Sequence, residues 1–253
     1  MNASTPMDHG ARVFLPAPRA RIGLIIPSVN TCSEPQFHYF APAGLGIHVA
    51  RARIVGPWKQ PLPVMAEEIA TAAQLLADCD PDLLVFHCTE TAMAQGPQGE
   101  ERLLDLIREA TGVETVATSQ LVREAFQALG LRTLVLLTPY QSNHTIIAYL
   151  QATGFTVVHD VALGLQAQAF SRVTPQQWVA LARDHARHEA DGVFLSCTNT
   201  TQIEAIVDIE GALGRPVVNS NQAVLWGCIT RLRGALPPLL SLPPLGRLMQ
   251  HLA

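Results

Sequence analysis

The sequence predicts an α/β protein made of two similar lobes, each with a parallel sheet. Short apolar runs alternate with helical patterns along the chain, as in successive βαβ units. Hydrophobic residues make up 48% of the chain and charged residues only 15%, which suits strands that are covered on both faces. The chain also repeats itself, because LLVFHCT at 83–89 has a near-copy, DGVFLSCT, at 191–198. Together these observations predict two related halves.

The expected elements follow from this alternation in chain order. Strands are expected at 22–26, 47–53, 83–87, 114–117, 133–137, 155–161, 192–196 and 216–219. Helices are expected at 62–77, 100–110, 119–129, 142–152, 175–189, 201–213 and 221–232. Thr174 before Pro175 is typical of an N-cap and a first helical residue, and Thr201 with Glu204 fits a capping box. Four glycines fit C-terminal caps between a helix and a strand: Gly112, Gly130, Gly154 and Gly214.

The repeat divides the chain near Thr118. We expect a first lobe at 21–118, completed by about 221–253, and a second lobe at 119–220. Residues 1–20 are expected to form a flexible arm, since they are rich in Pro, Ala and Gly. A proline-rich stretch at 237–244 leads into an apolar tail at 245–252, which we expect to pack on the surface or at a subunit contact.

Composition argues against several kinds of partner. The net charge is −4 and no run of Lys or Arg occurs, which disfavours nucleic acid as a ligand. No apolar run approaches the ~18 residues of a membrane span, and residues 1–20 lack the apolar middle of a signal peptide. Five cysteines without tight spacing do not suggest a disulfide framework. We therefore expect a cytoplasmic protein with reduced thiols.

The repeat places one thiol, Cys88 or Cys197, at the end of a buried strand in each half. Open α/β sheets build their sites at these strand ends, so one site with two opposed sulfurs is expected between the halves. Such a pair could move protons, or add and remove a thiolate, on opposite faces of a small substrate. The helix expected from Thr201 would let backbone N–H groups stabilise a thiolate at Cys197. Three unpaired cysteines are interpreted as small buried apolar residues: Cys32, Cys79 and Cys228.

Other kinds of site lack their motifs. Neither Cys-x-x-Cys nor His-Glu-x-x-His occurs, and His87 should point to the opposite face of its strand from Cys88. His185 and His188 are expected on a solvated helix face, so no metal is expected. The phosphate-binding loops and the Gly-x-Ser-x-Gly elbow are missing as well.

Small neutral polar residues follow the first strand of each half. Asn30 and Tyr140 occupy matching loops at similar distances before the two thiols, so we expect them to hold a substrate carboxylate. Ordinary helix capping is an equally good interpretation of several neighbouring residues: Ser28, Thr31, Ser142 and Asn143.

Four segments carry a resemblance to a known family: RIGLIIPSVNT at 21–31, TPY at 138–140, FLSCTN at 194–199 and RPVVNSNQ at 215–222. They resemble the maleate cis-trans isomerase and arylmalonate decarboxylase branch of the aspartate/glutamate racemase superfamily. The resemblance implies two Rossmann-like lobes with pseudo-twofold symmetry, a site in the cleft and no cofactor.

The resemblance also implies roles for individual residues. Cys88 matches the nucleophile that adds to the alkene in the maleate isomerases, and Cys197 matches the cysteine that moves a proton on the opposite side. Asn30 and Tyr140 match residues that hold the substrate carboxylates. The remaining residues expected to bind substrate are Ser28, Thr89, Thr198 and Asn199. Arylmalonate decarboxylases typically have glycine at the first cysteine position, so two thiols favour isomerase or racemase chemistry.

Two departures from the family pattern bear on the substrate. Thr89-Glu90-Thr91 replaces small residues after the first cysteine. If Glu90 faces the cleft it would repel a dianion, whereas it has no such effect if it turns to solvent. The segment 166–169 reads Gln-Ala-Gln-Ala, where maleate isomerases offer an asparagine.

The leading hypothesis is a cofactor-independent isomerase of a small dicarboxylate, with maleate to fumarate as the specific reaction. A racemase or malonate-type decarboxylase acting through a carbanion is the alternative within enzymes. A non-catalytic protein that binds a small acid is the alternative outside enzymes. In each case we expect a homo-oligomer that binds a small carboxylic acid.

Overall fold

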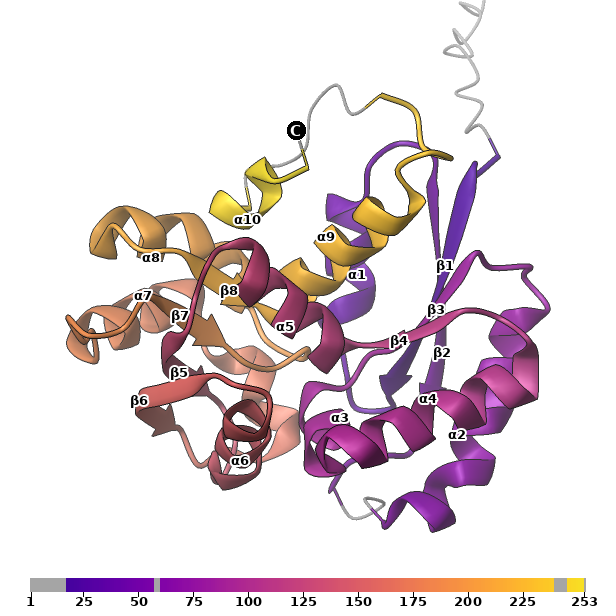
Figure 1. The fold of residues 1–253 in the computed structure, drawn as a ribbon, viewed down its shortest axis with the longest axis horizontal. Helices are drawn as coiled ribbons and strands as arrows, with labels where there is room; N and C mark the ends of the chain where they lie inside the picture. The colour runs from indigo at the N-terminus through magenta and orange to yellow at the C-terminus, as the bar shows by residue number, and fades with distance from the viewer. Residues whose placement is uncertain (1–16, 57–59, 239–244, 253) are drawn as a thin grey trace, which may run out of the picture.

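The two halves of the chain form two four-stranded parallel sheets with the same strand order. A computed structural model describes residues 17–56, 60–238 and 245–252. The first sheet has the order β2-β1-β3-β4 and the second the order β6-β5-β7-β8. The first sheet contains β1 (Ala20–Pro27), β2 (Leu45–Ala52), β3 (Leu83–Phe86) and β4 (Thr115–Ala117). The second contains β5 (Thr133–Thr138), β6 (Thr156–Ala162), β7 (Gly192–Leu195) and β8 (Val217–Asn219). The predicted two-lobed α/β fold is confirmed (Figure 1).

The strands are buried on both faces, which explains their unbroken apolar runs. On β1, Ile22, Leu24 and Ile26 pack into one core, while Ile25 packs into a second core with Phe86. The pairing is parallel and in register, with Leu24 opposite both Val49 and Val85. All eight observed strands lie within two residues of the predicted bounds.

Helices cover both sheets. In the first half they are α1 (Ser33–Phe40), α2 (Leu62–Ala77), α3 (Thr89–Ala94) and α4 (Gly96–Thr111). In the second half and beyond they are α5 (Thr118–Ala128), α6 (His144–Ala152), α7 (Pro175–Asp184), α8 (Ile206–Leu213), α9 (Ser220–Leu232) and α10 (Arg247–Gln250). Two 3₁₀ helices are η2 (Ala167–Arg172) and η3 (Gln202–Ala205). The sequence analysis did not predict α1, α3, η2 or α10. Among the described helices, none has the length and apolarity needed to cross a membrane.

Helix ends confirm one predicted cap and correct another. Thr174 Oγ1 accepts the N–H of Gln177, and Gln177 Oε1 accepts the N–H of Thr174. The capping box expected at Thr201 is wrong, because its hydroxyl donates to Val173 O at 2.6 Å and a 3₁₀ turn follows. Gly112 and Gly214 end α4 and α8 in the left-handed conformation, as predicted.

Helix α7 is also shorter than predicted and ends at Asp184. His185 and His188 therefore lie beyond the helix, which corrects their expected placement on a helix face. His188 is exposed, whereas His185 is half-buried, with Nδ1 3.0 Å from His159 Nε2.

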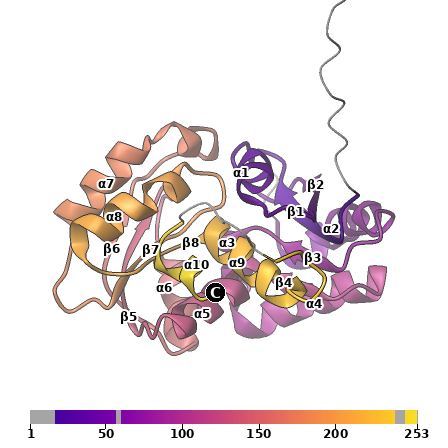
Figure 2. The same cartoon turned by 90° about the horizontal axis from the view of Figure 1, so that it is seen from above.

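Helices α5 and α9 pack against each other in the middle of the molecule, between the two sheets (Figures 1 and 2). A methyl group added at Gly227 would lie 2.6 Å from Leu121 Cδ2, so glycine at 227 allows the two helices to approach closely. Helix α9 also contacts α1, which links the end of the chain to the first half.

The C-terminal tail packs on α9 and β8 through α10. Leu248 and Met249 are buried. Glu210, which is 8% exposed, accepts the N–H groups of Val217 and Arg247. Residues 245–252 thus pack against the rest of the chain, as in one of the two placements expected for the tail. The flexible arm falls largely on residues 1–16 and the proline-rich stretch largely on 239–244, both outside the described residues.

Candidate active site between the two sheets

A cavity of about 270 Å³ lies where the carboxyl ends of the central strands of both sheets meet. It is lined by the residues that follow β1, β3, β5 and β7. Seven of the eight residues predicted for the site line it: Cys88, Cys197, Asn30, Tyr140, Thr89, Thr198 and Asn199. Ser28, the eighth, is one of the described residues but lies outside this lining. The fold thus brings residues from both halves to one cavity.

Cys88 lies at the N-cap of α3, directly after β3, and is 5% exposed. Its Sγ lies 3.1 Å from the hydroxyl oxygen of Thr91, one turn along the helix. The first backbone N–H groups of a helix favour negative charge at this position. No helix was expected directly after Cys88, and α3 is short, with six residues.

Cys197 follows β7 and is held in a different way. It is 4% exposed, and its Sγ accepts the N–H of Asn199 at 3.3 Å. Burial raises the pKa of Cys197 to about 12, against the opposing effect of hydrogen bonds from Asn199 and Tyr140. The helix expected from Thr201 begins as the 3₁₀ helix η3 at Gln202, and the N–H that contacts this sulfur belongs to Asn199, which precedes that helix. One loop N–H, not a helix terminus, therefore faces this sulfur, and the thiol is protonated near neutral pH.

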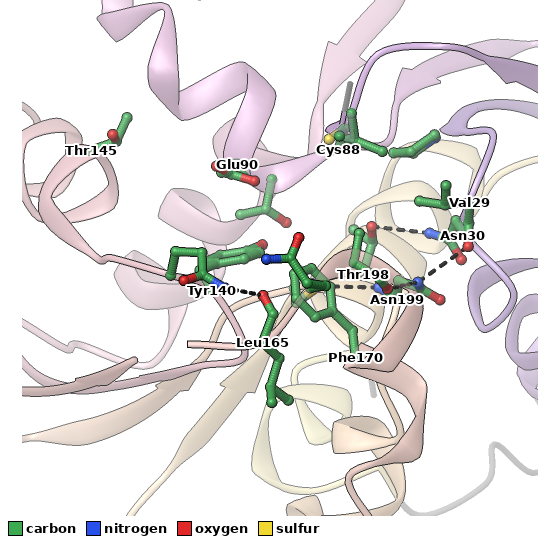
Figure 3. Close-up of a pocket in the computed structure, with 18 of the residues that line it drawn as sticks. Val29, Asn30, Cys88, Glu90, Tyr140, Thr145, Leu165, Phe170, Thr198 and Asn199 are labelled. Atoms are coloured by element: carbon green, nitrogen blue, oxygen red, sulfur yellow. Dashed lines mark hydrogen bonds between the residues drawn. The ribbon is translucent and has the colours of Figure 1, made fainter. Parts of the chain in front are cut away.

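Tyr140 and Glu90 bring further ionisable groups to the cavity (Figure 3). Tyr140 is 5% exposed and packs edge-on against Phe170, with 5.6 Å between the ring centroids. Its pKa is raised well above 10, first by burial and then by the nearby charges of Cys197, Glu90 and Cys88. Glu90 is half-buried in the lining, so of the two orientations that the sequence left open, it faces the cavity. The described part of the lining contains no lysine, arginine or histidine.

Asn30 and Asn199 join the two halves beside the cavity. Asn30 Oδ1 accepts the N–H groups of Cys32 and Ser33, while Nδ2 donates to Ser33 Oγ and to Thr198 Oγ1 at 3.1 Å. Asn199 Oδ1 accepts the N–H of Thr31 at 2.9 Å, across the same boundary. Both amides are therefore engaged in contacts between the loops that form the cavity.

His87 and Ser220 are positioning residues that the sequence analysis missed. Both nitrogens of the buried His87 ring have partners: Nδ1 lies 2.9 Å from Thr118 Oγ1, and Nε2 lies 3.0 Å from both Ser33 Oγ and Asn221 Oδ1. Burial lowers the pKa of His87 to about 3, so the ring is neutral. It points away from the cavity that Cys88 lines, as the strand pattern predicted.

Ser220 links the loops of the two thiols. Its Oγ accepts a hydrogen bond from Thr89 Oγ1 at 2.9 Å and another from the backbone N–H of Cys197 at 3.2 Å. The repeat of Thr118-Ser119-Gln120 at Ser220-Asn221-Gln222 was the available signal, because it marks the matching strand ends next to the site.

The other predicted positions are more peripheral. Gln166 lines the cavity, whereas Gln168 is exposed.

All five cysteines are free, and Cys79 is exposed, which corrects its interpretation as a buried apolar residue. Within the described residues, no group of three or more potential metal ligands gathers.

The sequence comparisons agree on one group of proteins. The family model for arylmalonate decarboxylase matches residues 23–236. Maleate isomerase from Nocardia farcinica is 28% identical over 246 residues, covering 91% of this chain and 96% of that protein. Maleate isomerase from Geobacillus stearothermophilus is 27% identical over 229 residues, covering 84% and 91%. Arylmalonate decarboxylase from Bordetella bronchiseptica is 31% identical over 151 residues, covering 58% and 62%.

Solved structures show the same fold. A cysteine-to-serine variant of Nocardia farcinica maleate cis-trans isomerase, with a covalently bound succinylcysteine intermediate, superposes with a TM-score of 0.81. It is 25% identical, and the match covers 92% of this chain and 98% of that one. A glycine-to-cysteine variant of arylmalonate decarboxylase has a TM-score of 0.78 at 25% identity, covering 91% and 99%. With the family model matched along most of its length, this chain belongs to the arylmalonate decarboxylase family.

Proposed function

We propose that the protein is a cofactor-independent cis-trans isomerase of a small dicarboxylate, converting maleate to fumarate. The observation that carries this proposal is the cavity lined by both Cys88 and Cys197, which come from equivalent strand ends of the two halves. The relatives that align over 84% and 91% of the chain are maleate isomerases, which supports the same reaction here.

Cys88 is the nucleophile in this proposal. Its thiolate adds to one alkene carbon, so a C–S bond forms and the π electrons move to the neighbouring carbon and its carboxylate. The N-terminus of α3 and the Thr91 hydroxyl stabilise negative charge on the sulfur. Addition turns the double bond into a single bond that rotates freely, which divides one difficult step into easier ones.

Cys197 is the acid and then the base. A pKa of about 12 keeps its proton in place near neutral pH, so it can donate that proton to the carbanion carbon. The hydrogen bonds from the Asn199 N–H and Tyr140 stabilise the thiolate that remains. After rotation this thiolate takes a proton back, the double bond re-forms and the C–S bond breaks, which returns the Cys88 thiolate and releases the trans product.

Neutral donors hold the substrate acid groups. We assign direct contact to Thr198, whose hydroxyl lines the cavity and accepts from Asn30, so that its own proton can reach the substrate. The hydroxyls of Thr89 and Tyr140 donate to Ser220 and to Cys197, and they hold these groups in place. Asn30 and Asn199 contribute by fixing the loops, because their amides are already engaged between the halves. Oriented donors of this kind stabilise the enediolate-like charge that develops on addition.

The test is to incubate the purified protein with maleate and follow the vinyl protons by NMR. Appearance of fumarate supports the proposal, and its absence with full activity on another acid overturns it. Decarboxylation is the second candidate, favoured by the 31% identity to arylmalonate decarboxylase. Release of carbon dioxide from an arylmalonate, retained after Cys88→Gly, would identify that activity instead.

We further propose that the protein works as a cytoplasmic homo-oligomer with lobes at 21–118 plus 221–253 and at 119–220. The packing of α9 against α1 supports the return of the chain to the first lobe. Sedimentation at micromolar concentration tests the oligomer, and a single monomeric species would contradict it.

A further inference from the structure

A carboxylate buried where the two halves meet has no part in the proposed reaction. Glu100 on α4 is 2% exposed and lies outside the cavity lining. Burying a carboxylate is costly unless hydrogen bonds and an opposite charge compensate it. Three donors do so for Glu100, and each of them lies beyond Thr118, in the second half of the chain.

The three donors come from two helices. Ser119 Oγ and Tyr149 OH both donate to Glu100 Oε2, the second at 2.5 Å, and Arg123 Nη2 donates to Oε1 at 3.2 Å. Ser119 and Arg123 belong to α5, whereas Tyr149 belongs to α6. Burial, and then the charge of Glu100, raise the pKa of Tyr149 above 10, so its hydroxyl keeps the proton that it donates. Glu100 therefore joins α4 to α5 and, through Tyr149, to α6.

The contact of α6 with the first half borders the active site. Both α3 and α4 contact α6 (Figure 1). Glu90 on α3 and Thr145 on α6 line the cavity from the two sides of this contact. The bond between Glu100 and Tyr149 thus lies next to a part of the cavity wall that both halves build.

The helices in this contact carry different parts of the reaction machinery. Cys88 caps α3, and α4 follows α3 after a single residue. The loop 139–143, between β5 and α6, contains Tyr140, whose side chain hydrogen-bonds to Cys197. A shift of α6 relative to α4 would therefore move the support of Cys197 relative to Cys88.

We propose that Glu100 and Tyr149 are positioning residues for the isomerisation. Their hydrogen bond holds α6 against α4, and so it keeps the loop 139–143 at a fixed distance from the N-terminus of α3. Cys197 then stays within reach of the substrate carbon to which it gives a proton and from which it takes one back, and proton transfer requires this reach. This inference rests on the proposed function and adds to it two residues that do not touch the substrate.

The bond should affect turnover more than substrate binding. Thr198, which we assign to substrate contact, is held by Asn30 through a bond that involves neither α4 nor α6. Loosening α6 therefore leaves this contact in place and disturbs the proton transfers.

The experiment compares two variants that each remove one hydroxyl from Glu100 Oε2. Tyr149→Phe removes the donor on α6, and Ser119→Ala, the matched control, removes the donor on α5, which also packs against α9. We expect Tyr149→Phe to lower kcat on maleate about tenfold with KM within about twofold of the wild-type value, whereas Ser119→Ala should keep kcat. Mass spectrometry should also find a substrate adduct on Cys88 in Tyr149→Phe, because removal of a proton from the adduct slows. A fall in stability alone would give neither the split between kcat and KM nor the adduct.

Hydrogen exchange of the unliganded proteins tests the positioning without any reaction. The amides of residues 139–148 should exchange faster in Tyr149→Phe than in the wild type or in Ser119→Ala. Glu100→Gln, which replaces one acceptor oxygen by a donor, should give the same pattern. This pattern supports the inference even if maleate is not isomerised and the proposed function falls. Isomerisation of maleate with equal exchange, or with equal kcat, in Tyr149→Phe and Ser119→Ala overturns the inference and leaves the proposed function standing.

Discussion

The loops after β3 and β7 have nearly the same sequence but hold their thiols differently. After Cys88 the chain enters α3 at once, so this sulfur lies at a helix N-terminus. After Cys197 the chain runs through a loop before η3. The Cys197 sulfur accepts hydrogen bonds from the N–H of Asn199 and from the side chain of Tyr140. The duplicated scaffold thus gives both thiols the same position relative to their sheets, and the following residues give them different chemistry.

The residues just before the two thiols differ as well. His87 makes hydrogen bonds through both ring nitrogens and connects β3 to α1, α5 and α9. Ser196, its counterpart before Cys197, has a buried hydroxyl with no hydrogen-bond partner in the part of the chain that the structure describes. The first loop is therefore anchored from behind by a neutral imidazole, whereas the second is held mainly by bonds to Asn30, Ser33, Ser220 and Asn221.

The largest effects are expected from exchanging the thiols themselves. Cys88→Ser and Cys197→Ser should each lower kcat on maleate by about 10²–10⁴-fold, but for different reasons. Intact-protein mass spectrometry distinguishes them. Cys197→Ser should accumulate an adduct of one substrate mass on Cys88, because solvent can protonate the carbanion after addition while removal of a proton from the adduct is impaired. Cys88→Ser should form none. An adduct on Cys197 would reverse the assigned roles.

Removing the anchor behind the first thiol should have the next largest effect. His87→Leu leaves Asn221, Ser33 and Thr118 without their buried partner, so the free energy of unfolding should fall by about 2–4 kcal/mol. Ser196→Ala removes a hydroxyl that has no described partner, and its effect should stay within about 0.5 kcal/mol. Urea denaturation followed by circular dichroism measures both, and equal losses would mean that the two positions are equivalent.

The buried His87 ring also predicts how the free energy of unfolding depends on pH. Burial lowers the pKa of His87 from its ordinary value of 6.5 to about 3 in the folded protein. Between these values the unfolded chain binds a proton that the folded chain does not. His87 therefore lowers the unfolding free energy as the pH falls from 6.5 towards 3, by at most about 1.4 kcal/mol per pH unit. The difference between wild type and His87→Leu should shrink on acidification, and a constant difference would contradict a neutral ring.

The sequence predicted the strands well because their apolar runs are local signals. It missed α1 because Asn30 was interpreted as a substrate-binding residue. In the structure, Asn30 Oδ1 accepts the N–H groups of Cys32 and Ser33 at the start of that helix. The contacts of His87 join residues 54 and 134 positions apart, and no local pattern shows such partners. The direction of Glu90 was open for the same reason, since only the packing of α3 decides which way its side chain points.

A smaller effect is expected at Ser220, which joins the two loops. Ser220→Ala leaves the buried N–H of Cys197 and the hydroxyl of Thr89 without this acceptor, which should cost about 1–2 kcal/mol of stability. It should also lower kcat several-fold with little change in KM, because the backbone at Cys197 loses its support, and Ser220→Thr should restore kcat. The matched control is Thr118→Ala at the equivalent helix start. It affects His87, which lies behind the first loop and outside the cavity lining, so it should lower stability with a smaller loss of kcat than Ser220→Ala.

The smallest effect is expected in an ultraviolet titration, where removing Cys197 should change nothing because this thiol keeps its proton. Its pKa of about 12, raised chiefly by burial, means that this thiol contributes no thiolate absorbance between about pH 7 and pH 10. Cys228, buried with a pKa of about 12, should be silent in the same range. In a Cys79→Ser background, which removes the exposed thiol, the ultraviolet titrations with and without Cys197→Ser should therefore coincide. A thiolate signal lost on Cys197→Ser in this range would mean that Cys197 gives up its proton before substrate arrives. It could then not protonate the carbanion, and the division of labour between the two loops would have to be reversed.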